Sequence, residues 1–159
     1  MGLDMYLDKR HYVRTFDSTP PDARFSVSVT RGGRPYPALK PERIKYIEEE
    51  VAYWRKANQI HNWFVVNVQE GRDECQDSEV STEQIGELLG LVTKVLADRS
   101  LAPELLPTQA GFFFGSTEYD ESYFEDLQYT QETLTSILAE MAEIDKSDYY
   151  AWLQYHASW

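Results

Sequence analysis

The stretch PERIKYIEEEVAYWRKANQIHNWFVVNV, residues 41–68, is the longest patterned segment of the chain. One stripe of residues recurs in it at steps of three and four: Ile44, Ile47, Val51, Trp54, Asn58, His61, Val65 and Val68. This spacing predicts a single amphipathic helix, because residues three or four apart share a helix face. Pro41 suits the first turn of such a helix. At about 1.5 Å per residue the helix would be ~40 Å long and would span the domain.

Two short strands are expected before this segment. Residues 3–7, Leu-Asp-Met-Tyr-Leu, alternate mainly between apolar and polar, which is typical of a half-buried strand. Residues 25–30 alternate more regularly and place Phe25, Val27 and Val29 on one face. A loop over residues 17–23 would join the two strands. Gly32-Gly33 and two nearby prolines predict a turn over residues 31–37.

Two further helices are expected after it. Ser81 and Gln84 have the spacing of a capping box, which predicts a helix that runs to about Asp98. That helix would bury Ile85, Leu88, Leu89, Val92 and Leu96. A stripe from Tyr123 to Ile144 predicts another helix over residues 120–144, with Asp120 as its N-cap.

The remaining segments complete the predicted fold. Residues 101–118 are interpreted as a loop with one short strand at 111–115, and residues 149–159 as a closing strand. A chain of 159 residues is about one domain long. The fold class is therefore α+β, with a small antiparallel sheet packed against about three helices in a single domain over residues 1–159.

Charge is unevenly distributed along the chain. The net charge is +4 over residues 1–45, −7 over residues 46–110 and −9 over residues 111–159, which gives −12 in all. An anionic surface repels nucleic acid and attracts basic protein surfaces. Two interpretations stay open: an ordinary solvated acidic face, or a nucleic-acid mimic directed at a DNA- or RNA-binding protein.

The sequence favours a cytoplasmic protein without a cofactor. The single cysteine, Cys75, cannot form an internal disulfide, and no apolar run is long enough for a membrane span. No basic start followed by an apolar stretch indicates a signal peptide. The three histidines have no metal-type spacing, and no phosphate-binding glycine motif or nucleophile motif is found. We therefore expect no metal and no catalytic residues, and the sequence favours a non-enzymatic protein.

The most unusual local feature is a pair of polar residues, Asn58 and His61, on the apolar stripe of residues 41–68. Buried polar groups need partners, because an unpaired one costs about 1–3 kcal/mol. In the structural interpretation, both side chains anchor the loop at 111–116 or a strand end. In the functional interpretation, Trp54, Asn58 and His61 line a ligand pocket in which an aromatic ligand stacks, and the neighbouring Arg55 and Lys56 supply charge to this site. Phe112, Phe113 and Phe114 are interpreted as core or an apolar contact patch rather than a stacking platform.

Three stretches together resemble an uncharacterised family of small proteins from phages, prophages and bacteria. They are MGLDMYL at residues 1–7, YWRKANQIHNWFV at 53–65 and LPTQAGFFFGSTEYD at 106–120. The resemblance covers most of the chain. It implies a phage or mobile-element setting and carries no catalytic residues.

Two functions follow as hypotheses. In the first, the protein is a phage accessory factor that binds a host protein with a basic surface, as anti-CRISPR or anti-restriction inhibitors of the DNA-mimic type do. No direct nucleic-acid binding and no membrane are expected. Its acidic face would comprise Glu118, Asp120, Glu121, Glu125, Asp126, Glu132, Glu140 and Glu143, with Asp145 and Asp148 beyond them. In the second, the chain is a module that binds or sequesters a small ligand or nucleotide. The sequence leaves the oligomeric state open.

Overall fold

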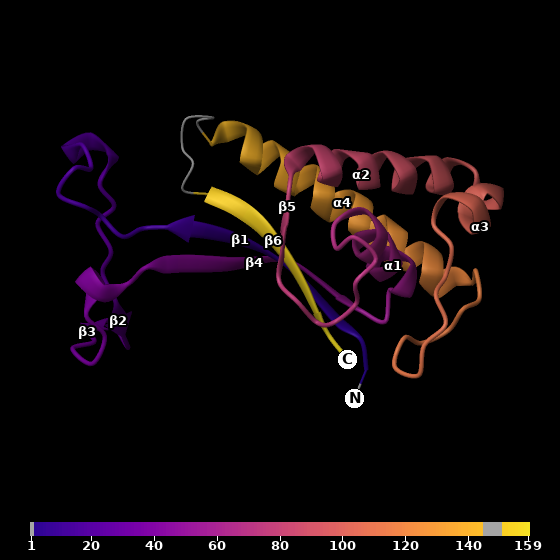
Figure 1. Cartoon of the computed structure of the whole chain (residues 1–159), viewed down its shortest axis with the longest axis horizontal. Coiled ribbons are helices and arrows are strands. Elements are labelled where there is room, and N and C mark those ends of the chain that lie inside the picture. Colours follow the sequence, from indigo (N-terminus) through magenta and orange to yellow (C-terminus); the bar gives the residue numbers. More distant parts are fainter. Residues whose placement is uncertain (1, 145–150) are drawn as a thin grey trace.

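The sheet is antiparallel and has the strand order β4-β1-β6-β5. The computed structural model describes residues 2–144 and 151–159. The strands are β1 (Asp4–Tyr12), β4 (Tyr46–Arg55), β5 (Ser78–Val80) and β6 (Ala151–Ser158). Helices α2 and α4 lie together on one side of this sheet (Figure 1). The predicted α+β class, with a small antiparallel sheet against helices, is confirmed.

Strand β1 is the central scaffold of the fold. Its alternation is the predicted one: Leu3, Met5 and Leu7 are fully buried, whereas Asp4 and Tyr6 between them are half-buried. Leu7 pairs with Ala52 of β4 on one side and with Tyr155 of β6 on the other. Side chains at alternate positions therefore point to the helices, and those between them point to the opposite face.

The single helix predicted over residues 41–68 is wrong. Residues 41–43 form a 3-10 turn, residues 46–55 form β4, and helix α1 covers only Asn58–Asn67. The first half is rich in β-branched and aromatic residues, and its alternate residues Ala52 and Trp54 are buried against β1 while Tyr53 is exposed. Pairing with β1 therefore overrides the apparent helical period.

The helix predicted from the capping box is confirmed as α2 (Thr82–Ala97). Ser81 Oγ accepts from the Gln84 amide at 3.1 Å, and Gln84 Oε1 accepts from the Ser81 amide at 3.0 Å. Of the five residues expected to be buried, Ile85, Leu88 and Val92 are fully buried. Leu89 and Leu96 are half-buried beside the core.

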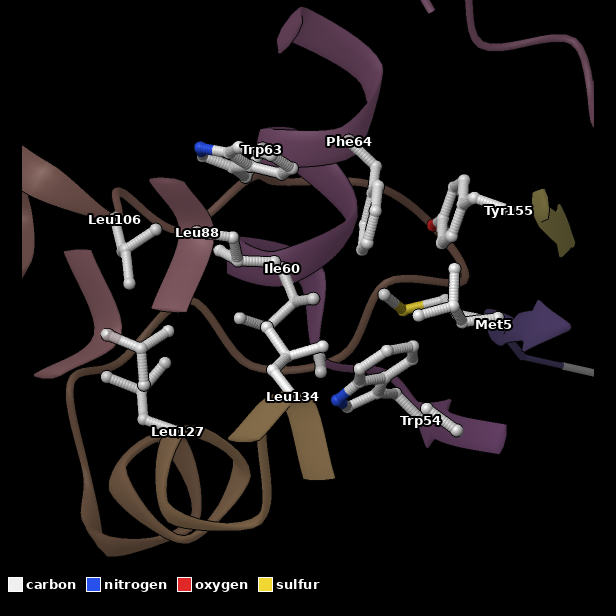
Figure 2. Packing of buried hydrophobic residues seen from close by; sticks show 14 of the residues in the cluster. Met5, Trp54, Ile60, Trp63, Phe64, Leu88, Leu106, Leu127, Leu134 and Tyr155 are labelled. Carbon is white, nitrogen blue, oxygen red and sulfur yellow. The ribbon is translucent and has the colours of Figure 1, made fainter. Parts of the chain in front are cut away.

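The helix predicted over residues 120–144 is confirmed as α4 (Glu121–Glu143), and Asp120 caps it by accepting from the Tyr123 amide at 3.1 Å. Leu127 and Leu134 of α4 face Ile60 of α1 in the core, together with Leu88 of α2 (Figure 2). Three elements from distant parts of the sequence thus share one apolar core.

The short strand predicted at residues 111–115 is wrong. The loop predicted from residue 101 is also wrong at its start, because a 3-10 turn (Arg99–Leu101) leads there into the one-turn helix α3 (Ala102–Leu105). The Phe114 amide donates to Gly111 O at 3.1 Å, so the backbone turns back on itself. Phe114 is buried and Phe113 half-buried, whereas Phe112 is 96% exposed. The three phenylalanines thus belong partly to the core and partly to the surface.

The closing strand predicted from residue 149 is confirmed as β6 over 151–158, while residues 149–150 and the Lys146-Ser147 break lie outside the described residues. The strand predicted at 25–30 is wrong, because only Thr30 joins a strand. That strand, β2 (Thr30–Arg31), pairs with β3 (Arg34–Pro35) across the predicted Gly32-Gly33 turn. No helix within 2–144 or 151–159 is long and apolar enough to cross a membrane.

Candidate functional site

Three segments that are distant in sequence meet where β4 leads into α1. The Leu3 amide donates to Phe113 O at 3.0 Å, and the Lys56 amide donates to Leu3 O at 2.8 Å. The start of β1, the β4–α1 junction and the loop of residues 106–120 are therefore tied together by backbone hydrogen bonds. These segments lie within the same three stretches on which the family resemblance rests.

Asn58 holds the loop of residues 106–120 against α1. Its Nδ2 donates to Phe114 O at 3.0 Å and to Ser116 O at 2.8 Å, while its Oδ1 accepts from the Gln109 amide at 2.8 Å. The side chain is 1% exposed, and both of its amide hydrogens have acceptors. This geometry agrees with the structural interpretation of Asn58.

The backbone at the β4–α1 junction makes a sharp turn. Lys56 has a φ of 61°, in the left-handed region that costs a non-glycine residue about 1–2 kcal/mol. Ala57 follows with φ −75° and ψ 69°, and the Asn58 amide donates to Lys56 O at 2.8 Å, which together make an inverse γ-turn. Gly115, with φ 88°, lies so close that an added Cβ would be 3.0 Å from Lys56 Cβ.

A cleft of about 180 Å³ opens beside this junction, at the N-terminal end of α4. Its lining comprises two cations, three carboxylates, two serine hydroxyls and three other residues: Arg55, Lys56, Gln59, Gly115, Ser116, Glu118, Asp120, Ser122, Tyr123 and Asp126. An engineered apolar cavity of about 150 Å³ takes up benzene, so the cleft suits a molecule of similar size. The lining therefore presents charged groups of both signs.

Comparison of the chain with protein-family models, with curated proteins and with solved structures gives no match. Among residues 2–144 and 151–159, no group of three or more His, Cys, Asp and Glu side chains is placed to hold a metal ion.

Asp126 is the most perturbed carboxyl in the cleft. Burial raises its pKa to about 6, and the nearby Glu125 and Asp120 carboxylates act in the same direction. Gln59 opposes this shift through a long hydrogen bond of 3.5 Å to Asp126 Oδ2. A partly buried carboxyl with a raised pKa in a cleft is typical of a functional site.

His61 lies in the core behind the cleft. Its Nδ1 is 2.8 Å from Tyr155 Oη and its Nε2 is 3.1 Å from Asp73 Oδ2. Because a carboxylate only accepts, Nε2 carries the proton and Nδ1 accepts from the tyrosine hydroxyl. Burial lowers the His61 pKa, which favours this neutral form, and Trp159 Nε1 donates to the other Asp73 oxygen at 3.0 Å.

Of the four predicted ligand residues, only Arg55 is part of the described lining of the cleft. Trp54 is 2% exposed and donates from Nε1 to Thr130 Oγ1 at 2.9 Å, while Asn58 and His61 face protein partners. The four predicted residues thus lie at or near the β4–α1 junction, but three of them do not line the cleft. Ser116, Ser122 and Gln59 were missed as lining residues, and the motif at 106–120 was the signal that pointed to Ser116.

The predicted acidic face follows α4. At about 100° per residue, Glu121, Glu125, Glu132 and Glu143 lie within about 40° of one another, on the exposed side of the helix. Helix α4 contains no Lys, Arg or His. Glu118 and Asp120 precede this row and are exposed, while Asp126 turns into the cleft.

Two members of the predicted acidic face have cationic neighbours. Glu121 is 3.1 Å from Arg99 Nη1, and Glu140 is 2.9 Å from Lys9 Nζ. Asp145 and Asp148 lie outside the described residues. The uncompensated part of the described face is therefore centred on Glu125, Glu132 and Glu143.

Proposed function

We propose that the protein binds a small zwitterionic molecule, of the size of an amino acid, in the cleft at the N-terminal end of α4. The opposition of charge around the cleft carries this proposal: Arg55 and Lys56 come from the β4–α1 junction, whereas Asp126 comes from α4. A ligand carboxylate would pair with the cations, and a ligand ammonium group would pair with Asp126. The neighbouring carboxylates Glu118 and Asp120 disfavour a phosphate or nucleotide.

Two costs at the cleft support a binding role. The left-handed backbone of Lys56 is held by Gly115 and by the hydrogen bond to Leu3, at some expense to stability. The burial of Asp126 disfavours its charged form at neutral pH. A cationic group on a ligand would stabilise the Asp126 carboxylate, so ligand binding offsets the second cost.

Thermal unfolding with each of the common amino acids in turn tests this proposal. A ligand present at about 100 times its Kd stabilises the folded state by about 2.7 kcal/mol, which is roughly 5–10 °C for a chain of this length. Titration calorimetry then measures the Kd. We expect Arg55→Ala and Asp126→Asn to abolish the heat of binding, and Lys94→Ala and Glu87→Gln, on α2, to leave it unchanged. The absence of any ligand-induced shift across the set would count against the proposal.

A second function is favoured by one specific observation, the row of glutamates on α4. We propose it as a docking face for a host protein with a basic surface, in the phage setting that the resemblance implies. The inhibitor would occupy a nucleic-acid-binding groove, as a DNA mimic does. Opposite charge steers such an encounter and makes it sensitive to salt.

A pull-down from bacterial lysate with a low-salt and a high-salt wash tests this second function. We expect a nucleic-acid-binding protein to be retained at low salt and released at high salt. Reversal of charge at Glu125 and Glu132 to lysine should remove the partner, whereas the same reversal at Glu87 and Glu104, outside α4, should not. If a partner protein is retained equally at low and high salt and also by the α4 charge-reversal variant, the proposed role of this face is contradicted.

A further inference from the structure

Residues 13–45, here called the arm, form a long excursion between β1 and β4. Figure 1 shows it beyond the end of the β1–β4 ribbon, on the side away from the helices. All of residues 13–45 are described, and of these only Val13 is buried. Phe16, Phe25 and Leu39 are 51%, 43% and 49% exposed. The arm thus has local turns but no core of its own.

The arm and the remainder of the chain have opposite charges. Residues 13–45 carry a net +4, and the other residues carry a net −16. The arm projects away from its own helices (Figure 1), and among the described residues none of its charged side chains forms an ion pair with the rest of the chain. Opposite charges attract strongly at low ionic strength, and such attraction speeds and orients association.

The arm also contains an amphipathic extended segment without a surface to cover. Residues 25–29 alternate in sequence like a strand but belong to no strand in the structure. Phe25 is exposed, and Val27 and Val29 are only half-buried. An apolar edge of this kind packs on a flat apolar or aromatic surface, as one sheet packs on another.

The second face of the sheet offers such a surface. Since Leu3, Met5 and Leu7 face the helices, the alternate residues of β1 and their partners face the other way. We call this the open face. By register it includes the aromatic residues Tyr6, Tyr12, Tyr46, Tyr53 and Trp152, and the polar residues Asp4, Asp8, Arg10, Glu48, Glu50, Arg55, Glu79, Gln154, His156 and Ser158. Tyr46 and Tyr53 are 43% and 37% exposed.

The open face also contains an unpaired donor. Gln154 is 6% exposed and lies opposite Asp8 in register. Its Oε1 accepts from Arg10 Nη1 at 2.7 Å, and because a guanidinium only donates, this contact determines the orientation of the amide. Among the described residues its Nε2 has no acceptor. A backbone carbonyl from an incoming segment would supply one.

We propose that two copies of this chain associate by exchanging arms, with residues 24–34 of each lying across the open face of the other. The apolar edge of residues 25–29 packs on the exposed Tyr53. Arg31 and Arg34 approach the carboxylates of Glu50 and Glu79. The contact is reciprocal, which is the usual arrangement in a symmetric dimer. This inference is independent of the proposed ligand cleft.

Sedimentation equilibrium or light scattering at low and high salt tests the exchange. We expect a mass of twice the 18.5 kDa chain at low salt and a shift to the monomer as salt rises. Arg31→Glu with Arg34→Glu should give a folded monomer at low salt. The control, Arg72→Glu with Lys94→Glu, makes the same charge change outside the arm and should stay dimeric. A wild-type monomer at low salt, or a dimer that tolerates the arm reversal, would overturn the proposal.

A charge swap tests the surface that receives the arm. Glu50→Lys with Glu79→Lys should also be monomeric by itself, and circular dichroism verifies that each variant is folded. An equimolar mixture of this variant with the Arg31→Glu, Arg34→Glu variant should form a heterodimer. Failure of the mixture to associate would overturn the assignment of the open face. Binding of duplex DNA by a monomeric wild-type chain, lost on arm reversal, would identify nucleic acid as the arm's partner instead.

Discussion

Lys56 is the residue at which backbone strain and the candidate cleft coincide. Its φ of 61° costs a lysine about 1–2 kcal/mol, whereas glycine adopts this conformation freely. The relief of this strain in a Lys56→Gly variant is partly offset by the larger conformational entropy of glycine in the unfolded chain. We therefore expect Lys56→Gly to be more stable than Lys56→Ala by about 1 kcal/mol, measured by urea unfolding. Both variants remove the ammonium group and should weaken ligand binding equally. Equal stability of the two would show that the junction is not strained.

Asp126 should make stability depend on pH. Its pKa of about 6 in the folded chain exceeds the ordinary 3.8, so the folded state holds the proton more tightly than the unfolded state does. Stability from the protonated carboxyl is thus present at acidic pH and is lost as pH rises from about 4 to about 6. We expect Asp126→Asn to raise the melting temperature at about pH 7.5 and to change it little near pH 4. A variant that is less stable than the wild type at about pH 7.5 would contradict this assignment.

At the scale of elements, Asn58 anchors the loop of residues 106–120 to α1. Asn58 supplies three hydrogen bonds to its backbone, so Asn58→Ala leaves three polar groups unpaired in a largely buried place. We expect a loss of about 2–4 kcal/mol, with faster hydrogen exchange at the Gln109 amide. Asn62→Ala, a half-buried position on the same helix, is the matched control and should change stability by less than about 1 kcal/mol. Similar losses in both variants would argue against the anchoring role.

The elements that could be predicted from the sequence are those with local signals. The Ser81–Gln84 capping box marks the start of α2, and the Asp120 cap with its long apolar stripe marks α4. The segment at 41–68 carries two signals, a step of three and four and a high content of β-branched and aromatic residues. The choice between them is made by β1, because pairing of Ala52 with Leu7 is a contact between distant parts of the chain. No pattern within residues 41–68 contains that information.

The candidate site could likewise be predicted only where it depends on local sequence signals. Polar residues on an apolar stripe indicated that Asn58 and His61 need buried partners, and the structure supplies them. The cleft in front of them is formed by Lys56, Ser116 and Asp126, which come from three separate elements. Spacing along the chain does not reveal such a meeting, so the sequence indicated the region and not the lining.

At the scale of the whole molecule, charge and burial divide the chain into two parts. Residues 1–12 and 46–159 contain nearly the whole described core and carry a net −16, whereas the arm carries +4 and buries only Val13 among its own residues. A folded chain gains little stability from an ordered segment that buries so little. The arm is therefore better explained by what it contacts outside its own chain than by a role in folding.

Because the arm contributes only Val13 to the buried residues, we expect that it can be removed without loss of the fold. The Val13 amide donates to Lys45 O at 3.0 Å, so the two ends of the excursion are already adjacent. Replacing residues 16–43 with a short Gly-Ser linker removes only exposed or half-buried side chains and shortens the loop that folding must close. We expect the urea-unfolding free energy of the shortened chain to lie within about 1 kcal/mol of the wild-type value. A large decrease in the unfolding free energy would contradict this prediction. It would mean that contacts made by the arm stabilise β1 and β4.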